Sequence, residues 1–269
     1  MKAELHAHST ASDGLDAPGA LVGRAHAAGV ALLALTDHDT LDGLPEAAAA
    51  ARRAGVALVA GVELSVTVGG AEVHLLAYGV DPAHAPLRDH LDGFREVRRA
   101  RAAEMVERLN ALGVPVRLEA VLRRAGTGVV GRPHVAAEVV AVGAAPDVGQ
   151  AFARYLHDGG PAAAPKPEVD ARAMVRLVHD AGGLAVLAHP GLLPSDDVFG
   201  AALRTGLDGI EVQHPSHSWA TVKWLREEAR AAALLETAGS DFHGRAQDEG
   251  RLGQYAIPAE TLAALRRYA

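Results

Sequence analysis

The sequence contains no cysteine, so neither a disulfide nor a thiolate metal site can form. Any bound metal must therefore take nitrogen and oxygen ligands. Aromatic residues are also scarce, at 4%, although 49% of the 269 residues are hydrophobic. Alanine, valine and leucine must therefore form most of the core. This composition suits an α/β protein in which helices pack closely on a sheet.

Positive charge is limited, and the formal net charge is -7. This balance disfavours a broad nucleic-acid-binding face, which is normally basic. It still allows a short nucleotide to be drawn to a small positive pocket made by metals and one or two arginines. The N-terminal segment lacks the apolar stretch of a signal peptide, and no run approaches membrane-spanning length. We therefore expect a cytoplasmic protein with no membrane partner.

Short apolar runs that end in a titratable residue recur along the chain and alternate with helical patterns. Polarity alternates along residues 3–8, which places His6 and His8 on one side of a strand. Continuous Val, Ile, Leu and Ala runs are typical of buried parallel strands, and a Gly-Gly turn at 69–70 predicts a hairpin. Strands that end in titratable residues indicate a barrel with its site at the strand C-termini. The other runs are 31–36, 56–64, 72–80, 183–189, 209–214 and 233–241.

The middle of the chain differs from its two ends. It carries a charged helical stretch at 88–112 and no strong strand, and a proline-rich segment at 159–170 leads back to the βα pattern. We interpret residues 83–168 as a helical insertion domain that covers the site. Residues 1–82 and 169–269 then form the catalytic domain. Shorter helices are expected near 118–125, 133–142 and 147–157.

A lone His-x-His pair is a weak signal, because chance alone supplies roughly 0.7 such pairs in a chain of this composition. By themselves, His6 and His8 are equally well explained as exposed residues on an edge strand. Asp37-His38 gains weight only because it directly follows an apolar run. We interpret five other histidines as solvated helix or loop residues: His26, His84, His90, His157 and His179.

The joint pattern of donors is far more specific than any pair. Nine candidates are expected at or beside the end of a core strand. Imidazoles and carboxylates without sulfur suit Mn²⁺, Fe or Zn²⁺, and carboxylates can bridge adjacent ions. Nine donors exceed what one ion can use, and three ions is the natural count. The nine are His6, His8, Asp13, His38, Glu63, His74, His189, Asp241 and His243.

In six segments the chain resembles the PHP-domain (polymerase and histidinol phosphatase) phosphoesterases. They are ELHAHSTASDG (4–14), LTDHDTLDG (35–43), GVELSV (61–66), EVHLLAYG (72–79), LAHPG (187–191) and GSDFHG (239–244). The similarity is closest to the stand-alone bacterial branch that includes 3′,5′-nucleoside bisphosphate phosphatases and 5′-3′ exoribonucleases. VVGRPHVA (129–136) and GIEVQHPSHS (209–218) are similar to that branch as well. The resemblance implies a distorted (β/α)7 TIM-like barrel with a trinuclear metal site.

The resemblance also implies how the nine donors share three ions. His6, His8, Glu63 and Asp241 would hold the first ion; Glu63 would bridge to a second ion held by His74 and His189; Asp13, His38 and His243 would hold the third. Some family members have a histidine in place of Asp13, so this chain is the carboxylate variant. Asp37 is better interpreted as an orienting partner of a ligand than as a ligand.

Five residues are candidates for contacting the substrate. Arg132 and His134, at the expected start of a helix, would form a phosphate clamp, mainly on the strength of the resemblance. The alternative for Arg132 is an ordinary surface ion pair. His214 and His217 would line the pocket, with a capped loop as the alternative. Lys166 is the weakest, because its surroundings depart from the aromatic-containing stretch that the resemblance leads us to expect.

We therefore expect a metal-dependent phosphomonoesterase that acts on a small nucleotide, either a nucleoside 3′,5′-bisphosphate or a monophosphate. Mn²⁺ is the favoured ion, with Fe or Zn²⁺ as alternatives. A metal-bound hydroxide would attack phosphorus, because metals lower the pKa of bound water, and the ions would neutralise the phosphate oxygens. Two alternatives remain open: a 5′-3′ exonuclease on short RNA or DNA oligonucleotides, and a non-catalytic metal-binding regulatory module.

Overall fold

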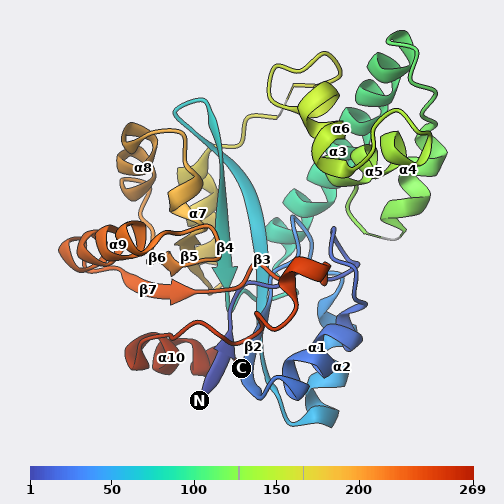
Figure 1. Cartoon of the computed structure of the whole chain (residues 1–269). Coiled ribbons are helices and arrows are strands. Elements are labelled where there is room, and N and C mark those ends of the chain that lie inside the picture. The colour runs from blue at the N-terminus through green and yellow to red at the C-terminus, as the bar shows by residue number, and fades with distance from the viewer. Residues whose placement is uncertain (127, 166) are drawn as a thin grey trace. The chain divides into compact units, whose positions relative to one another are not determined.

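The computed structural model describes residues 1–126, 128–165 and 167–269, and the chain divides into two compact units (Figure 1). The first unit comprises Met1–Asp89 and Glu168–Ala269, and the second comprises His90–Pro167. Lys166, one of the expected substrate contacts, lies outside the described residues. Over the described ranges, no helix has both the length and the apolar character needed to cross a membrane.

A seven-stranded sheet with its strands in chain order forms the centre of the first unit. All adjacent strands pair in parallel except β4, which is antiparallel to both of its neighbours. The α/β class expected from the sequence is confirmed. An isolated parallel bridge, Ala7 to Phe242, pairs the segment after the last strand with the segment after the first. Closure into a full barrel stays a prediction. The strands are β1 (Lys2–Glu4), β2 (Val30–Leu35), β3 (Ala57–Val68), β4 (Ala71–Tyr78), β5 (Leu184–Leu187), β6 (Gly209–Gln213) and β7 (Leu235–Ala238).

Strand β2 illustrates why the parallel strands are apolar throughout. Its side chains alternate between two faces, and both faces are buried. Leu33 and Leu35 pack in a cluster with helices α1 (Pro18–Ala27) and α2 (Leu44–Ala54). Leu32 and Ala34 pack in a second cluster with residues of four other strands and of the C-terminal helix. Neither face of the strand is available for polar residues. Metal-donor side chains can therefore lie only beyond the end of β2.

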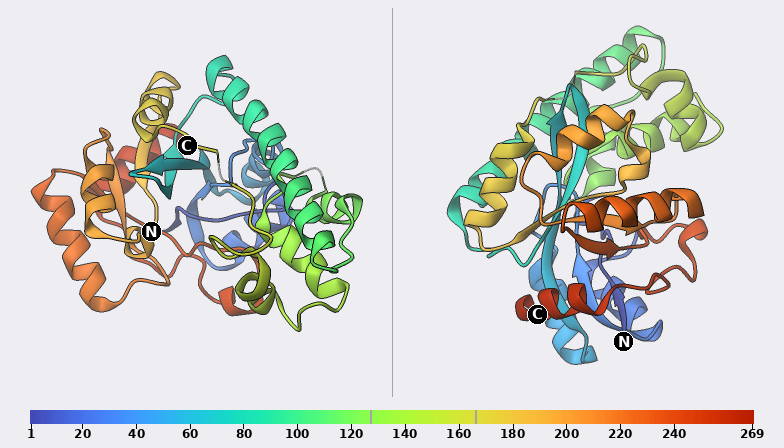
Figure 2. Two further views of the ribbon diagram at one scale, coloured as in Figure 1. Left: turned by 90° about the horizontal axis from the view of Figure 1, so that it is seen from above. Right: turned by 90° about the vertical axis from the view of Figure 1, so that its left-hand side faces the viewer.

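The helices of the C-terminal half of the chain pack against β5, β6 and β7, except α8, which contacts β3 (Figure 2). They alternate with the strands along the chain, which is the βα order that the sequence predicts. The bounds are α7 (Ala171–Asp180), α8 (Asp196–Leu203), α9 (Trp219–Ala231) and α10 (Ala259–Leu265), with short turns η2 (Pro190–Leu192), η3 (Ala246–Asp248) and η4 (Arg266–Tyr268).

The β3–β4 hairpin has the two-residue glycine turn expected from the sequence. Gly69 and Gly70 both have positive φ, of 58° and 79°, which favours a tight hairpin turn. Strand β3 is twelve residues long and extends past β2, whose last pair is Leu35 with Ala60. The expectation that every donor lies at or beside a strand end is therefore wrong for Glu63 and His74, which lie inside these two strands. The overhang of β3 still leaves Glu63 level with the end of β2, because it bridges to His38.

The second unit is helical, and its described residues form no strand. It has its own core, which includes Met105, Leu109, Val121, Val135 and Val139. Helix α3 begins in the first unit and continues into the second. The bounds are α3 (Ala85–Ala111), α4 (Leu118–Ala125), α5 (Arg132–Ala141), α6 (Val148–Ala151) and the π-helical turn η1 (Phe152–Leu156).

Candidate metal centre

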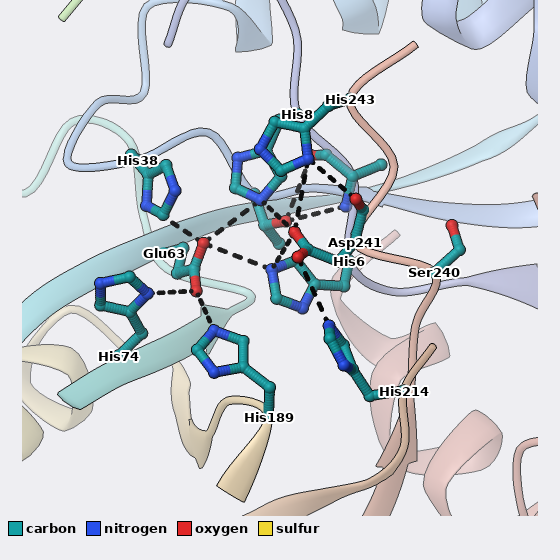
Figure 3. A network of polar contacts seen from close by, with 12 residues as sticks. His6, His8, His38, Glu63, His74, His189, His214, Ser240, Asp241 and His243 are labelled. Carbon is teal, nitrogen blue, oxygen red and sulfur yellow. Dashed lines mark hydrogen bonds and ion pairs between the residues drawn. The ribbon is translucent and has the colours of Figure 1, made fainter. Parts of the chain in front are cut away.

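The candidate donors reach one place because parallel strands end at the same edge of a sheet. His6 and His8 follow β1, His38 follows β2, and His189 follows β5. Asp241 and His243 follow β7, while Glu63 and His74 come from the β3–β4 hairpin. In Figure 3 these side chains point toward one another, with Glu63 at the middle. The structure thus brings together residues from both ends of the chain.

Glu63 is surrounded by five imidazoles and is 1% exposed. One of its carboxylate oxygens faces three of the rings, and the other oxygen faces two. The Oε2 distances are 3.3 Å to His6 Nε2, 3.2 Å to His8 Nε2 and 3.1 Å to His38 Nδ1; the Oε1 distances are 2.9 Å to His74 Nδ1 and 3.0 Å to His189 Nε2. A carboxylate placed in this way is suited to bridging two ions.

Two aspartates complete the cluster. Asp241 Oδ1 lies 3.5 Å from His6 Nε2 and 3.3 Å from His8 Nε2. Asp13 Oδ1 lies 3.2 Å from His243 Nε2. Among the described residues, donor atoms of eight of the nine candidates, all except His189, fall into three overlapping groups, within each of which all atoms lie within 4.8 Å of one another. These groups are His8–Asp13–His38–His243, His6–His8–Asp241 and His38–Glu63–His74.

Several of these atoms are buried without a hydrogen-bond partner in the described part of the chain. They approach each other at ion-pair distances, yet their geometry is not that of hydrogen bonds. A buried polar group left without a partner costs about 1–3 kcal/mol, so a cluster of them needs a compensating ligand. Divalent cations that take nitrogen and oxygen donors fit this need. The atoms are His6 Nε2, His8 Nδ1 and Nε2, Asp13 Oδ1, His38 Nδ1 and Glu63 Oε2.

The pKa values of the metal-free cluster show how strongly it attracts positive charge. Burial alone would lower the pKa of His8, but Asp241 and Glu63 outweigh it and raise that pKa to about 10. Burial is likewise outweighed at His74, where Glu63 and Glu72 raise the pKa to about 10. At His38 burial prevails and lowers the pKa to about 4. Protons therefore neutralise the carboxylates where metal ions would otherwise do so.

Two of the candidate donors have a strained backbone. His189 has φ 30° and Asp241 has φ 49°, in the left-handed region that residues with a Cβ rarely adopt. Such strain persists only where the surroundings enforce it, and it gathers at functional sites. The amide of His189 donates to Glu211 Oε2 over 2.8 Å, which is one such restraint.

Asp37 holds the loop that carries Asp13. Its carboxylate accepts hydrogen bonds from the Ser9 amide (2.7 Å), the Ser9 hydroxyl (2.7 Å) and the Ser12 hydroxyl (2.6 Å). Asp37 is 1% exposed, so these bonds are well shielded from water. Its hydrogen bonds reach the backbone and hydroxyls of the loop between His8 and Asp13, not an imidazole.

Glu211 was missed by the sequence analysis, although it is fully buried beside the cluster. Its Oε1 lies 3.0 Å from His6 Nδ1. Gly239 makes this contact possible, because a Cβ at that position would lie 2.2 Å from His6 Cβ and 2.9 Å from Glu211 Oε1. The signal in the sequence was a single acidic residue within the apolar run of β6.

Arg245 was also missed, and it is the residue that follows the SDFHG motif. Its Nη2 lies 3.8 Å from Asp13 Oδ2, and its side chain is 40% exposed. The Asp248 carboxylate fixes the local backbone by accepting from the amides of both His243 and Arg245. An arginine is thus held beside the candidate donors with part of its surface open to solvent.

His214 and His217 have different surroundings. His214 is buried, with Nε2 3.4 Å from Asp241 Oδ2 and its ring 5.4 Å from that of His189, so it belongs to the cluster. His217 has both ring nitrogens engaged with backbone. Its Nε2 accepts from the Gly191 amide (3.0 Å), and its Nδ1 donates to the Val212 carbonyl (2.9 Å). His217 therefore ties two loops together and has no ring nitrogen left for a substrate.

Arg132 and His134 lie in the second unit and make local contacts there. Arg132 Nη1 lies 2.7 Å from Asp158 Oδ1, and its guanidinium lies over the ring of Phe152 at 5.9 Å. His134 Nδ1 accepts from the Gly131 amide over 3.1 Å at the start of α5. In this structure Arg132 thus has the ion pair that the sequence analysis gave as its alternative.

Known proteins of similar sequence cover nearly the whole chain. The PHP domain model matches residues 4–115. A 5′-3′ exoribonuclease of Haemophilus influenzae is 35% identical over 90% of both chains, and a 3′,5′-nucleoside bisphosphate phosphatase of Chromobacterium violaceum is 37% identical over 89% of this chain and 86% of its own. A phosphoribosyl 1,2-cyclic phosphate 1,2-diphosphodiesterase of Eggerthella lenta is 36% identical over 96% of this chain and 100% of its own.

Two solved structures share the fold over almost all of both chains. A Bifidobacterium adolescentis protein assigned as a metal-dependent phosphoesterase superposes with a TM-score of 0.90 at 31% identity, covering 99% of this chain and 96% of its own. A Chromobacterium violaceum amidohydrolase, with bound sulfate and no metal, has a TM-score of 0.91 at 34% identity, covering 100% and 97%. With the buried cluster of imidazoles and carboxylates, these likenesses establish that the chain belongs to the PHP-domain family and is a metal-dependent phosphoesterase.

Proposed function

We propose that this protein is a phosphatase that releases inorganic phosphate from a small nucleotide, with a nucleoside 3′,5′-bisphosphate as the preferred substrate and a nucleoside monophosphate as the second. The observation that carries the proposal is the arrangement around Glu63, where five imidazoles and two further carboxylates meet with several hydrogen-bonding atoms unsatisfied. The identity to a 3′,5′-nucleoside bisphosphate phosphatase supports the choice of substrate.

We assign three divalent ions to this cluster, and Mn²⁺ is the favoured one, with Fe or Zn²⁺ as alternatives. The two-sided surroundings of Glu63 support its role as the bridge between the first two ions. In this assignment His6, His8, Glu63 and Asp241 would hold the first ion, Glu63, His74 and His189 would hold the second, and Asp13, His38 and His243 would hold the third. When bound, such ions lower the pKa of coordinated water and neutralise phosphate oxygens.

The chain's own residues orient the substrate. We propose that Arg245 binds a substrate phosphate, because its guanidinium lies beside Asp13 and is partly exposed. A planar guanidinium can donate two parallel hydrogen bonds to phosphate oxygens, which fixes the orientation of the phosphate. The sulfate in the Chromobacterium violaceum structure supports an anion site in this family. His214, packed against Asp241, would limit the movement of that carboxylate.

Arg132, His134 and Lys166 stay proposed substrate contacts on the strength of the family resemblance alone. For Arg132 the proposal has a structural requirement, since its guanidinium must exchange the Asp158 carboxylate for a phosphate. Asp158 is largely exposed, so this exchange would release only a solvent-screened ion pair.

The proposal is tested with purified protein loaded with Mn²⁺ and offered a panel of nucleotides. The panel contains nucleoside 3′,5′-bisphosphates, 5′-monophosphates, 3′-monophosphates and a cyclic phosphate. Colorimetric phosphate detection, with mass spectrometry of the products, identifies the bond that is cleaved. We expect phosphate release fastest from a 3′,5′-bisphosphate and abolished by chelation. Phosphate release from no member of the panel would contradict the proposal.

A second activity, 5′-3′ exonuclease action on short oligonucleotides, is favoured by the identity to a 5′-3′ exoribonuclease. A labelled RNA oligonucleotide of a few residues distinguishes the two activities, because an exonuclease releases mononucleotides whereas a phosphatase leaves the chain length unchanged. The metal content of the same preparation tests the non-catalytic alternative. Fewer than two ions per chain after Mn²⁺ or Fe supplementation would favour a regulatory module.

A further inference from the structure

Glu211 lies beneath the candidate metal centre and contacts two of its histidines at once. It belongs to β6, whereas His6 follows β1 and His189 follows β5. Glu211 Oε1 lies 3.0 Å from the ring nitrogen His6 Nδ1, and Glu211 Oε2 accepts from the backbone amide of His189 over 2.8 Å. The side chain is 0% exposed, so neither contact is shared with bulk water.

The chemistry of these contacts fixes where the His6 proton lies. An ionised carboxylate has no hydrogen to donate, so the hydrogen bond requires that His6 Nδ1 carry the proton. The opposite nitrogen, Nε2, faces the carboxylates of Glu63 and Asp241 and has no hydrogen-bond partner among the residues that the structure describes. The ring is therefore held in the orientation and tautomer in which Nε2 can bind a metal.

The second oxygen acts on the backbone of His189. With φ 30°, His189 is in a strained conformation that persists only where its surroundings enforce it. The bond from its amide to the Glu211 carboxylate is a charge-assisted restraint on that conformation. It aims the ring of His189 so that Nε2 reaches Glu63 Oε1 at 3.0 Å.

We propose that Glu211 is a positioning residue that sets the tautomer of His6 and the backbone of His189, and so fixes the distance between the two ions that Glu63 would bridge. The inference rests on the proposed metal centre and adds to it. His6 is assigned to one of those ions and His189 to the other, and their rings are stacked with centroids 5.8 Å apart. One rigid side chain thus couples both halves of the bridged pair.

Glu211→Gln is the sharpest variant, because both partners of Glu211 are donors. A carboxylate accepts from both, whereas an amide has one acceptor oxygen and must turn its NH₂ toward one of them. Changes to groups that orient metal ligands typically weaken metal binding about 10–100-fold. We expect the Mn²⁺ dissociation constants of E211Q, measured by competition with a chelating indicator, to rise by about this factor.

Glu4→Gln is the matched control. Glu4 is another buried glutamate next to His6, and its partners within the described part of the chain are the backbone amides of His6, Ser240 and Gly253 and the Ser240 hydroxyl, all of which donate to it. The same chemical change there removes a buried acceptor without facing an imidazole ring. We expect E4Q to lower the melting temperature while weakening Mn²⁺ binding less than E211Q does. Equal losses of affinity in the two variants would overturn the proposal.

Nitrogen-15 NMR of the histidine rings in the Zn²⁺-loaded wild-type protein tests the proposal without any variant. The ring signals of His6 are assigned by through-bond correlations to its backbone. We expect this ring to be protonated at Nδ1 and metal-bound at Nε2. We also expect the Nδ1–H signal to shift in E211Q and to stay unchanged in E4Q. Coordination through Nδ1 in the wild type would overturn the proposal even if E211Q fails to fold. A wild type that binds metal while E211Q binds it equally well refutes this role alone, whereas a wild type that binds no metal refutes the proposed function as well.

Discussion

Replacing Gly239 with alanine adds one methyl group at the most tightly packed point of the candidate centre. The added Cβ would lie 2.2 Å from His6 Cβ, 2.9 Å from the His6 amide nitrogen and 2.9 Å from Glu211 Oε1. Ordinary contact begins at 3.4 Å, so His6 and Gly239 must separate by a further 1.2 Å to restore it (3.4 − 2.2 Å). The φ of Gly239 is not in the left-handed region, so alanine can adopt the backbone and the effect comes from the methyl group alone.

The expected magnitude follows from packing and from catalytic geometry. Overpacking of a well-packed interior costs about 1–3 kcal/mol in the free energy of unfolding. A shift of about 1 Å in a catalytic group can cost about 10²-fold in rate. We therefore expect the Gly239→Ala protein to unfold at lower denaturant concentration, to retain less Mn²⁺ and to lose about two orders of magnitude in kcat/KM.

The assay compares Gly239→Ala with Gly23→Ala. Gly23 lies in helix α1, and an added Cβ there meets no heavy atom within 4 Å. The control should gain about 0.5–1 kcal/mol, because alanine is favoured over glycine inside a helix. Unfolding is followed by circular dichroism in urea, and retained metal by elemental analysis after desalting. Wild-type stability and metal content in Gly239→Ala would refute the packing argument.

Three further predictions concern charge at the centre. Asp241→Asn should abolish turnover and lower the metal content while circular dichroism shows an unchanged fold; near-normal activity would count against Asp241 as a ligand. The pKa values of His8 and His74 are raised from 6.5 to about 10 in the metal-free protein, so their contribution to stability is fully present below pH 6.5 and is lost as pH rises through 10. Thermal melts in the presence of a chelator should therefore show a melting temperature that falls from pH 7 to pH 10. The affinity for Mn²⁺ should rise over the same range, because the ligands must lose their protons to bind metal. A melting temperature that does not change with pH would contradict these pKa shifts. Arg245→Ala should raise KM for a nucleoside bisphosphate more than for a monophosphate. Arg245→Lys should give intermediate KM values, because lysine keeps the charge but loses the bidentate geometry. Equal KM values in the wild type and both variants would exclude a phosphate contact.

The sequence predicted the local features well, because those depend on neighbouring residues. The glycine pair at 69–70 predicted the hairpin, since both positions need positive φ, and the structure has that turn. The helix expected near 118–125 is α4, and the one expected near 133–142 is α5. Alternation along residues 3–8 predicted that His6 and His8 project to one side, and both rings face Glu63.

Other features could not be found in this way, because they depend on contacts between distant segments. The engagement of both His217 nitrogens with backbone depends on how the loop after β5 meets the end of β6. The ion pair of Arg132 with Asp158 joins residues 26 positions apart. No periodic pattern in the sequence encodes such pairings. A polar residue that a motif predicts to contact substrate can therefore have its hydrogen-bonding groups already engaged by neighbouring residues of the protein.

The sequence by itself determined the chemistry that this protein can use: no sulfur ligands, a set of imidazoles and carboxylates, and a series of strands whose ends deliver most of them to one edge of the sheet. The tertiary structure decided which of these atoms meet. Glu63 and His189 are 126 positions apart, and His6 and Glu211 are 205 positions apart, yet each pair is in hydrogen-bond contact. The spatial distances between these side chains are set by the packing of the sheet, including the space left by Gly239. Only the folded chain fixes how close two groups come when they lie far apart in the sequence.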